Sequence, residues 1–198
     1  MAVRPRPAAT SQVPPQPAPV PELVSDPVWS LRPWPVEIDL GSRVVTIPAL
    51  PAADWLTHLM GEVNPDAVFP GLLSADEEEL VEDMLYTGVL SLDQLDRIFL
   101  DVVSAVGARP WWVTLRLVAQ VRANWAVIGA DMLVRGVDAT RLSLSGWLDV
   151  ALLTLMRHIR PEDSTMFTLQ LEAPPPSETA QVQDELEMSP EAFLALAG

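Results

Sequence analysis

Few side chains in this sequence are of the types that catalysis or metal binding requires. The chain has no cysteine, which excludes disulfides, thiolate nucleophiles and thiolate metal sites. Its two histidines, His58 and His158, stand one hundred residues apart, and neither lies in a zinc-binding helix motif. We therefore expect each histidine to lie on the surface of a helix.

A run of carboxylates is the feature closest to a metal site. It consists of Asp76, Glu77, Glu78, Glu79, Glu82 and Asp83. The spacing lacks the Asp-x-Asp-x-Asp-Gly loop of a calcium-binding hand. Acids in the first turn of a helix are stabilised by the helix macrodipole. The pattern thus favours a solvated helix start over a divalent-ion site.

The motifs of common enzyme classes are also missing from the sequence. The nine glycines form neither a phosphate-binding loop nor a dinucleotide-binding pattern, and no G-x-S-x-G elbow occurs. Acids are too widespread for any one carboxylate pair to stand out as an acid–base couple. We expect a protein that is not an enzyme, with no catalytic, cofactor-binding or metal-binding residues. A metal-dependent activity abolished by chelation would argue otherwise.

The composition of the chain argues against nucleic acids and membranes as binding partners. The chain has 198 residues, 49% of them hydrophobic, which suffices for one domain with tails. Twenty-seven acids against twelve arginines and no lysine give a net charge of -15, which argues against nucleic-acid binding. No secretory signal is recognisable, and the apolar window from Val113 to Val134 contains Arg116, Arg122 and Asp131, each costly at a bilayer centre. We expect a soluble cytoplasmic protein with no membrane partner.

The stretch RPWWVTLRLVAQVRANW, residues 109–125, combines aromatic, apolar and basic side chains. It opens a predicted helix over 110–135. One narrow arc of this helix is polar, and the remainder is apolar, as in the central helix of a bundle. The polar arc holds Arg116, Gln120, Asn124, Asp131 and Arg135. Trp111, Trp112 and Trp125 are then core residues or anchors of a protein interface.

Arg122 lies outside the polar arc of that helix. One interpretation is a buried arginine stem whose guanidinium pairs with Asp101 or Asp149. The other is an interface arginine beside tryptophans, since these residue types dominate binding hot spots.

The remaining elements frame this helix. Residues 1–35 are proline-rich, and we expect a disordered arm. The alternating residues of VEIDLGSRVVTI, 36–47, predict a β-hairpin, and no later strand is expected. Helices are predicted at 51–60, 74–85, 91–107, 143–159 and 162–171. Ser74 with Glu77 and Ser91 with Gln94 form capping boxes, and the helix after Ser91 should bury one face: Leu92, Leu95, Ile98, Val102 and Val106.

The predicted fold class is therefore mainly α: a helical bundle with a small N-terminal hairpin over 36–172, flanked by disordered tails. The tail over 173–198 is acidic and ends in SPEAFLALAG, where Ser189 and Pro190 favour the start of a short helix. Phe193, Leu194 and Leu196 would give this helix an apolar side.

The order of these segments resembles the tail assembly chaperones of long-tailed bacteriophages, particularly those infecting G+C-rich bacteria. The similarity covers residues 36–198. It rests on the hairpin VEIDLGSRVVTIPALPAADWL, on FPGLL at 69–73, on RPWWVTLRLVAQVRANW, on MFTLQLEAPPP and on the closing SPEAFLALAG.

The resemblance implies a chaperone in the host cytoplasm that coats the tape measure protein, a long helical chain, until tail tube subunits polymerise around it. It also implies self-association, or association with a longer form made by a programmed frameshift. The protein-binding residues that we expect are Trp111, Trp112, Arg122, Trp125, Phe193 and Leu196. The alternatives are a structural minor tail or connector protein of the virion, and an unrelated helical adaptor.

Overall fold

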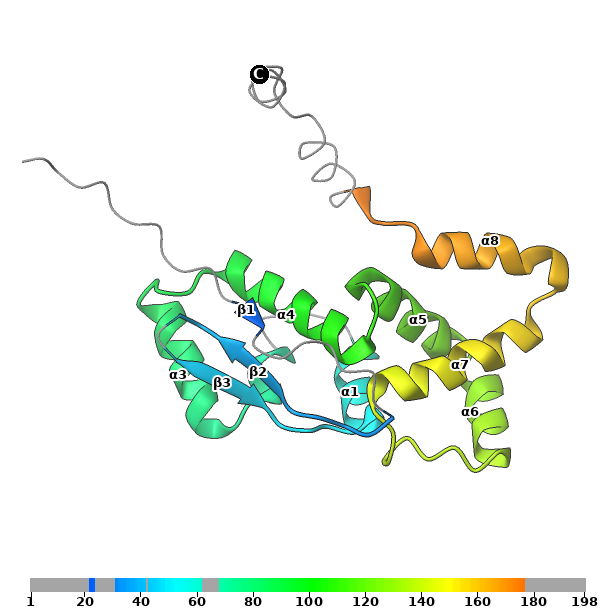
Figure 1. The fold of residues 1–198 in the computed structure, drawn as a ribbon, viewed down its shortest axis with the longest axis horizontal. Coiled ribbons are helices and arrows are strands. Elements are labelled where there is room, and N and C mark those ends of the chain that lie inside the picture. The colour runs from blue at the N-terminus through cyan, green and yellow to red at the C-terminus, as the bar shows by residue number, and fades with distance from the viewer. Residues whose placement is uncertain (1–21, 24–30, 42, 62–67, 177–198) are drawn as a thin grey trace, which may run out of the picture.

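The computed structural model describes residues 22–23, 31–41, 43–61 and 68–176. Figure 1 shows a small sheet beside α3 and α4, followed by helices α5 to α8. This confirms the mainly α fold class with an N-terminal hairpin. The elements are β1 (Glu22–Leu23), β2 (Val36–Asp39), β3 (Val44–Ile47), α1 (Ala52–Leu59), η1 (Pro70–Leu72), α3 (Ala75–Tyr86), α4 (Leu92–Gly107), α5 (Trp111–Ala123), α6 (Trp125–Val134), α7 (Leu144–His158) and α8 (Pro161–Glu172).

The predicted hairpin is β2 and β3. Val36 pairs with Ile47 and Ile38 pairs with Val45 in an antiparallel register, and all four side chains are buried. The turn relies on Gly41, whose φ of 83° is a left-handed conformation that glycine adopts without strain. The side chain of Asp39 accepts a hydrogen bond from the Gly41 backbone N–H at 2.7 Å.

Within residues 1–35, the segment predicted to be a disordered arm, the structure describes residues 22–23 and 31–35. Glu22–Leu23 form β1, antiparallel to β2, because the outer edge of β2 offers unpaired backbone groups. Further along the arm, the Leu31 carbonyl accepts a hydrogen bond from the Ser143 backbone N–H at 2.9 Å. Trp34 packs partly buried against the core.

Helix α3 begins at the predicted capping box and is joined to the sheet through it. Glu77 accepts hydrogen bonds from the Ser74 backbone N–H and hydroxyl. Its second carboxylate oxygen accepts from the Thr46 backbone N–H on β3 at 2.8 Å. One carboxylate therefore satisfies the start of α3 and ties that helix to the hairpin.

Helix α4 confirms its capping box and most of its predicted buried face. Ser91 accepts from the Gln94 N–H, and the Gln94 side chain accepts from the Ser91 N–H. Leu95, Ile98, Val102 and Val106 are buried. Leu92 is the exception: its side chain is 56% exposed, because the first turn of α4 extends beyond the core.

Helix α4 ends at Gly107, as predicted, but the glycine is needed there because α4 and α5 approach each other closely at this residue. The left-handed residue that ends the helix is Ala108, with φ of 50°. A Cβ atom on Gly107 would lie 2.2 Å from the Thr114 Oγ1 atom on α5. The absence of a side chain at Gly107 is therefore what lets the two helices meet so closely.

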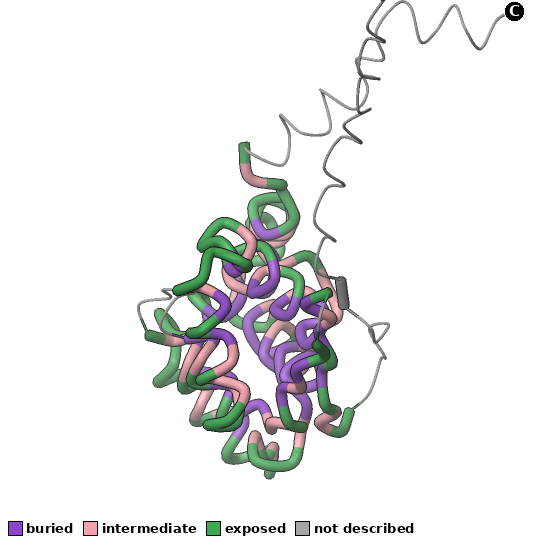
Figure 2. Tube along the Cα trace, turned by 90° about the vertical axis from the view of Figure 1, so that its left-hand side faces the viewer, coloured by how far each residue is buried: buried purple, intermediate pink, exposed green. Residues whose placement is uncertain are grey.

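Helix α5 has the central position expected of it. It packs against α4, α7 and α8, and it also contacts α1 and α6. Val113, Leu117, Val118 and Val121 are buried in the one hydrophobic core that also takes residues from the sheet. Figure 2 shows the buried segments of the chain gathered inside the domain, with exposed segments around them.

The predicted single helix over 110–135 is wrong: it breaks at Asn124 into α5 and α6. The Asn124 side chain donates to the Gln120 carbonyl at 2.8 Å, and its backbone takes φ of -115° and ψ of 22°. Asparagine competes with helical hydrogen bonding in this way. The chain then turns into α6, which packs on α7. The helical period of the sequence continues through the break, so it gives no sign of it.

The two closing helices follow their predictions. Ser143 caps α7 by accepting from the Gly146 N–H at 3.1 Å. Pro161 occupies the first turn of α8, which ends at Glu172 before the prolines. Helix α8 has a single buried residue, Leu171, and it lies along α5 at the edge of the bundle.

Candidate protein-binding surface

Trp111 and Trp112 start α5 and are half-buried against the core. Their rings meet edge to face with centroids 5.7 Å apart, a favourable aromatic geometry. The indole N–H of Trp112 donates to the Glu172 carbonyl oxygen at 3.2 Å. In the described structure Trp112 therefore holds the end of α8.

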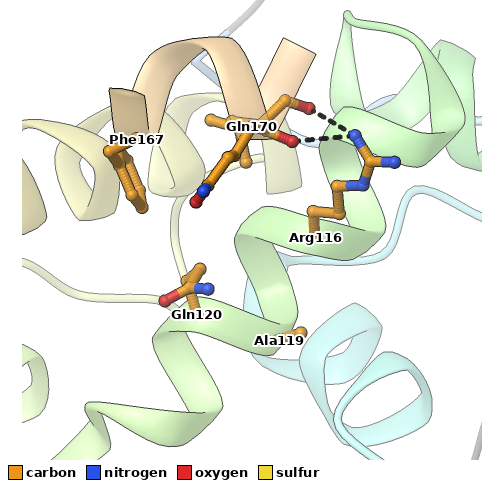
Figure 3. Close-up of a pocket in the computed structure, with 6 residues that line it drawn as sticks. Arg116, Ala119, Gln120, Phe167 and Gln170 are labelled. Carbon is orange, nitrogen blue, oxygen red and sulfur yellow. Dashed lines mark hydrogen bonds between the residues drawn. The ribbon is translucent and has the colours of Figure 1, made fainter. Parts of the chain in front are cut away.

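Arg116, one turn further along α5, binds the same end of α8. Its Nη1 atom donates to the carbonyl oxygens of Gln170 at 2.9 Å and Leu171 at 3.2 Å, and to that of Ala173. Figure 3 shows the guanidinium reaching this backbone. The last carbonyls of a helix lack intrahelical partners and carry partial negative charge, which a cation stabilises. Arg116 lies in the predicted polar arc, and its guanidinium binds the backbone of α8.

An open depression of about 120 Å³ lies between α5 and α8 beside their contact. Figure 3 shows Phe167 and Gln170 above Ala119 and Gln120. The lining residues carry no carboxylate, hydroxyl or imidazole, and Arg116 is committed to backbone oxygens. The depression therefore offers no acid–base pair. Its full lining is Arg116, Ala119, Gln120, Phe167, Gln170 and Leu171.

Trp125 belongs to a different part of the surface from the other two predicted tryptophans. Helix α5 separates them, and its thirteen residues span about 20 Å at 1.5 Å per residue. Trp125 is 50% exposed, and its ring stacks on that of the buried Trp147, with centroids 6.3 Å apart. One face of this indole is thus fixed by the core, and the other side is open to a partner.

The interpretation of Arg122 as a buried, carboxylate-paired arginine is wrong. Its side chain is exposed at the last turn of α5, and Nη1 lies 3.4 Å from the Gly61 carbonyl oxygen. Asp149 is bound instead by Arg109, at the other end of α5. Arg122 lies on the solvent-facing side of the last turn of α5, whereas its neighbour Val121 is fully buried. Arg122 is therefore available to an interface beside Trp125.

The solvent-facing side of α6 is the most apolar exposed surface of any described helix. We call it the α6 face: Ala126, Val127, Ala130, Leu133 and Val134, all exposed. Leu133 is 80% exposed and Val134 is 87% exposed, while Ile128 and Met132 point into the core. A helix that is apolar all round is normally buried on all sides. The α6 face is thus the strongest candidate for contact with another protein segment.

Arginines lie near both ends of α6. Arg135 binds Asp131 at 2.7 Å, and the hydrogen bond from Arg135 holds the pKa of Asp131 below its ordinary value, with the charge of Arg157 adding to the effect. Asp131 is thus a carboxylate between two cations. Arg122 adds a third cation at the start of α6. The local charge is positive around an apolar surface.

This local charge is part of a wider asymmetry. Residues 109–160 contain seven arginines and three aspartates, a formal charge of +4 in a chain whose total is -15. The acids lie mostly in the first helices and in the C-terminal segment. An apolar face in a positively charged part of the chain favours an acidic, amphipathic binding partner.

The described residues show neither a metal-binding cluster nor a single helix that could span a membrane. Among the residues that the structure describes, no three His, Asp or Glu side chains gather closely enough to hold a metal ion. His158 Nδ1 lies 2.9 Å from the Thr154 carbonyl oxygen, within its own helix. Within the same described ranges no single helix is long and apolar enough to cross a membrane; α4 and α5 qualify only as a pair, bent by 70°.

Two of the residues predicted to bind protein, Arg122 and Trp125, lie at or beside this candidate surface. Leu133 and Val134 were not among the predicted residues, because the sequence pattern placed them inside one long core helix. The apolar run from Trp125 to Val134, with Asp131 as its single charge, was the available signal. Phe193 and Leu196 lie outside the described residues.

Comparison with known proteins adds no identity: no protein-family model, no curated protein and no solved structure matches this chain.

Proposed function

We propose that this chain is a tail assembly chaperone of a long-tailed bacteriophage, which binds the tape measure protein and keeps it soluble during tail assembly. The proposal starts from the resemblance of residues 36–198 to that family. The observation that supports it best is the α6 face, an apolar helix surface exposed on an otherwise acidic protein. Such a surface suits an amphipathic helix, and tape measure proteins are long and helical.

The physical requirements of such a chaperone agree with the described surface. Binding an apolar helix needs exposed anchors, and helix-in-groove recognition uses apolar side chains spaced along one face. Trp125, Val127, Leu133 and Val134 supply four exposed anchors on α6. The overall charge of -15 keeps a complex with an apolar client in solution.

Co-expression with the long helical protein encoded nearby tests the proposal. The expected result is a client that is insoluble alone and that becomes soluble and co-purifies with this chain. An unchanged client would overturn the proposal. Recovery of this chain from finished virus particles would instead favour the structural tail protein.

A further inference from the structure

We infer that the α6 face binds the C-terminal segment of its own chain, residues 177–198, when no client is present. The inference is based on the charges and the apolar residues of the α6 face and of residues 177–198. Only its consequence, that a client must displace the segment, rests on the proposed function.

The two segments have complementary charge. Residues 177–198 contain five acids and no basic residue: Glu178, Asp184, Glu185, Glu187 and Glu191. Arg122 precedes α6 and Arg135 follows it, and the charge of Arg157 on α7 acts on Asp131, the carboxylate of α6. Elsewhere in the described helices the acids of α3 and the start of α4 would repel the segment.

The apolar surfaces are complementary as well. Phe193, Leu194 and Leu196 follow the helix-start pair Ser189-Pro190, so the segment can present one apolar side as a short helix. The α6 face presents Val127, Leu133 and Val134 to solvent. Joining the two faces removes both apolar surfaces from water, which is favourable in proportion to the area covered.

The chain is long enough for binding within one molecule. Arg116 fixes the chain at Ala173, about 14 Å along α5 from the start of α6 at 1.5 Å per residue. Residues 177–192 reach up to about 50 Å when extended. Attachment through a segment of this length gives the tail an effective concentration on the order of millimolar, which favours the tail over a second copy at micromolar protein.

The lack of cysteine allows a direct test in the full chain without client. Ala130→Cys on the α6 face is combined with Ala197→Cys in the tail, and disulfide formation is followed under oxidised glutathione. The matched control places the first cysteine at Val89, which is 62% exposed between α3 and α4, near the acids. Circular dichroism verifies that both variants are folded.

The expected result is an intramolecular crosslink that forms at least about tenfold faster for Ala130 than for Val89, because the tail dwells at the α6 face. Replacing Asp184, Glu185 and Glu187 with amides should slow the Ala130 crosslink. Equal rates for the two pairs would overturn the inference. Crosslinks at Ala130 that join two chains only would also overturn it, with a second copy as the occupant. None of these outcomes depends on the tape measure protein, so they separate this inference from the proposed function.

Discussion

Trp112 and Arg116, one turn apart on α5, both donate hydrogen bonds to the carbonyl end of α8. Helix α8 buries only Leu171, so these bonds are a large share of what keeps it on the bundle. The two side chains replace the partners that the last turn of any helix lacks.

Arg116→Ala should therefore release the end of α8. Loss of the charged hydrogen bonds, partly screened at this half-buried site, predicts a destabilisation of about 1–2 kcal/mol. Hydrogen exchange of the α8 amides should rise more than that of α4. Arg97→Ala, an exposed arginine on α4, is the control. Unchanged α8 exchange would show that the bonds do not hold the helix.

Gly107→Ala should destabilise the domain, because the new Cβ atom would meet Thr114 Oγ1 at 2.2 Å. Overpacking of this kind costs about 1–3 kcal/mol. Combining it with Thr114→Ala should recover part of the loss, which a double-mutant cycle measured by urea unfolding would show as coupling. Simple additivity of the two substitutions would contradict the close approach.

Thr114→Val should change stability by no more than about 1 kcal/mol, because removal of an unpaired buried hydroxyl offsets the cost of a larger methyl group beside Gly107. The Thr114 hydroxyl is fully buried and has no hydrogen-bond partner, so its removal leaves no other group unpaired. Thermal unfolding is the measurement, with Thr154→Val as the control, since Thr154 Oγ1 donates to Asp131. The control variant should be less stable. A loss at Thr114 as large as that at Thr154 would refute the prediction.

Glu77 should make the free energy of unfolding decrease as the pH falls into the acid range. Partial burial raises the pKa of Glu77, but the hydrogen bonds from Ser74 and Thr46 together hold it below its ordinary value of 4.5. A carboxylate with a lowered folded-state pKa contributes stability above its unfolded pKa, and the contribution is lost as pH falls through the folded pKa.

Glu77→Gln should therefore flatten the decline of unfolding free energy below about pH 4.5. Glu79→Gln, an exposed neighbour on α3, should keep that decline. Urea unfolding between pH 3 and 7 distinguishes them. Parallel curves for the wild type and the Glu77 variant would contradict the role given to this carboxylate.

The parts of the fold that local signals specify were predictable from the sequence. Alternating residues and Gly41 predict the hairpin, and Ser74 with Glu77 and Ser91 with Gln94 predict two helix starts. The break at Asn124 has no such signal, because the helical period continues and the new direction is fixed by packing of α6 on α7.

The same break explains why Leu133 and Val134 were not predicted at the surface, because α6 no longer continues a core helix. Arg122 is exposed on the solvent-facing side of α5 itself. Arg116 could be recognised as polar, but its partners are carbonyls some fifty residues later in the chain, brought close only by the tertiary fold.

The central claim is that the α6 face binds the client. Its most direct test is the amount of tape measure protein that co-purifies with Leu133→Glu/Val134→Glu, compared with wild type and with Val89→Glu. Both acidic variants change exposed positions, so both should fold. We predict that the α6 variant loses the client and that the Val89 variant keeps it. Equal client recovery with all three proteins would contradict the claim.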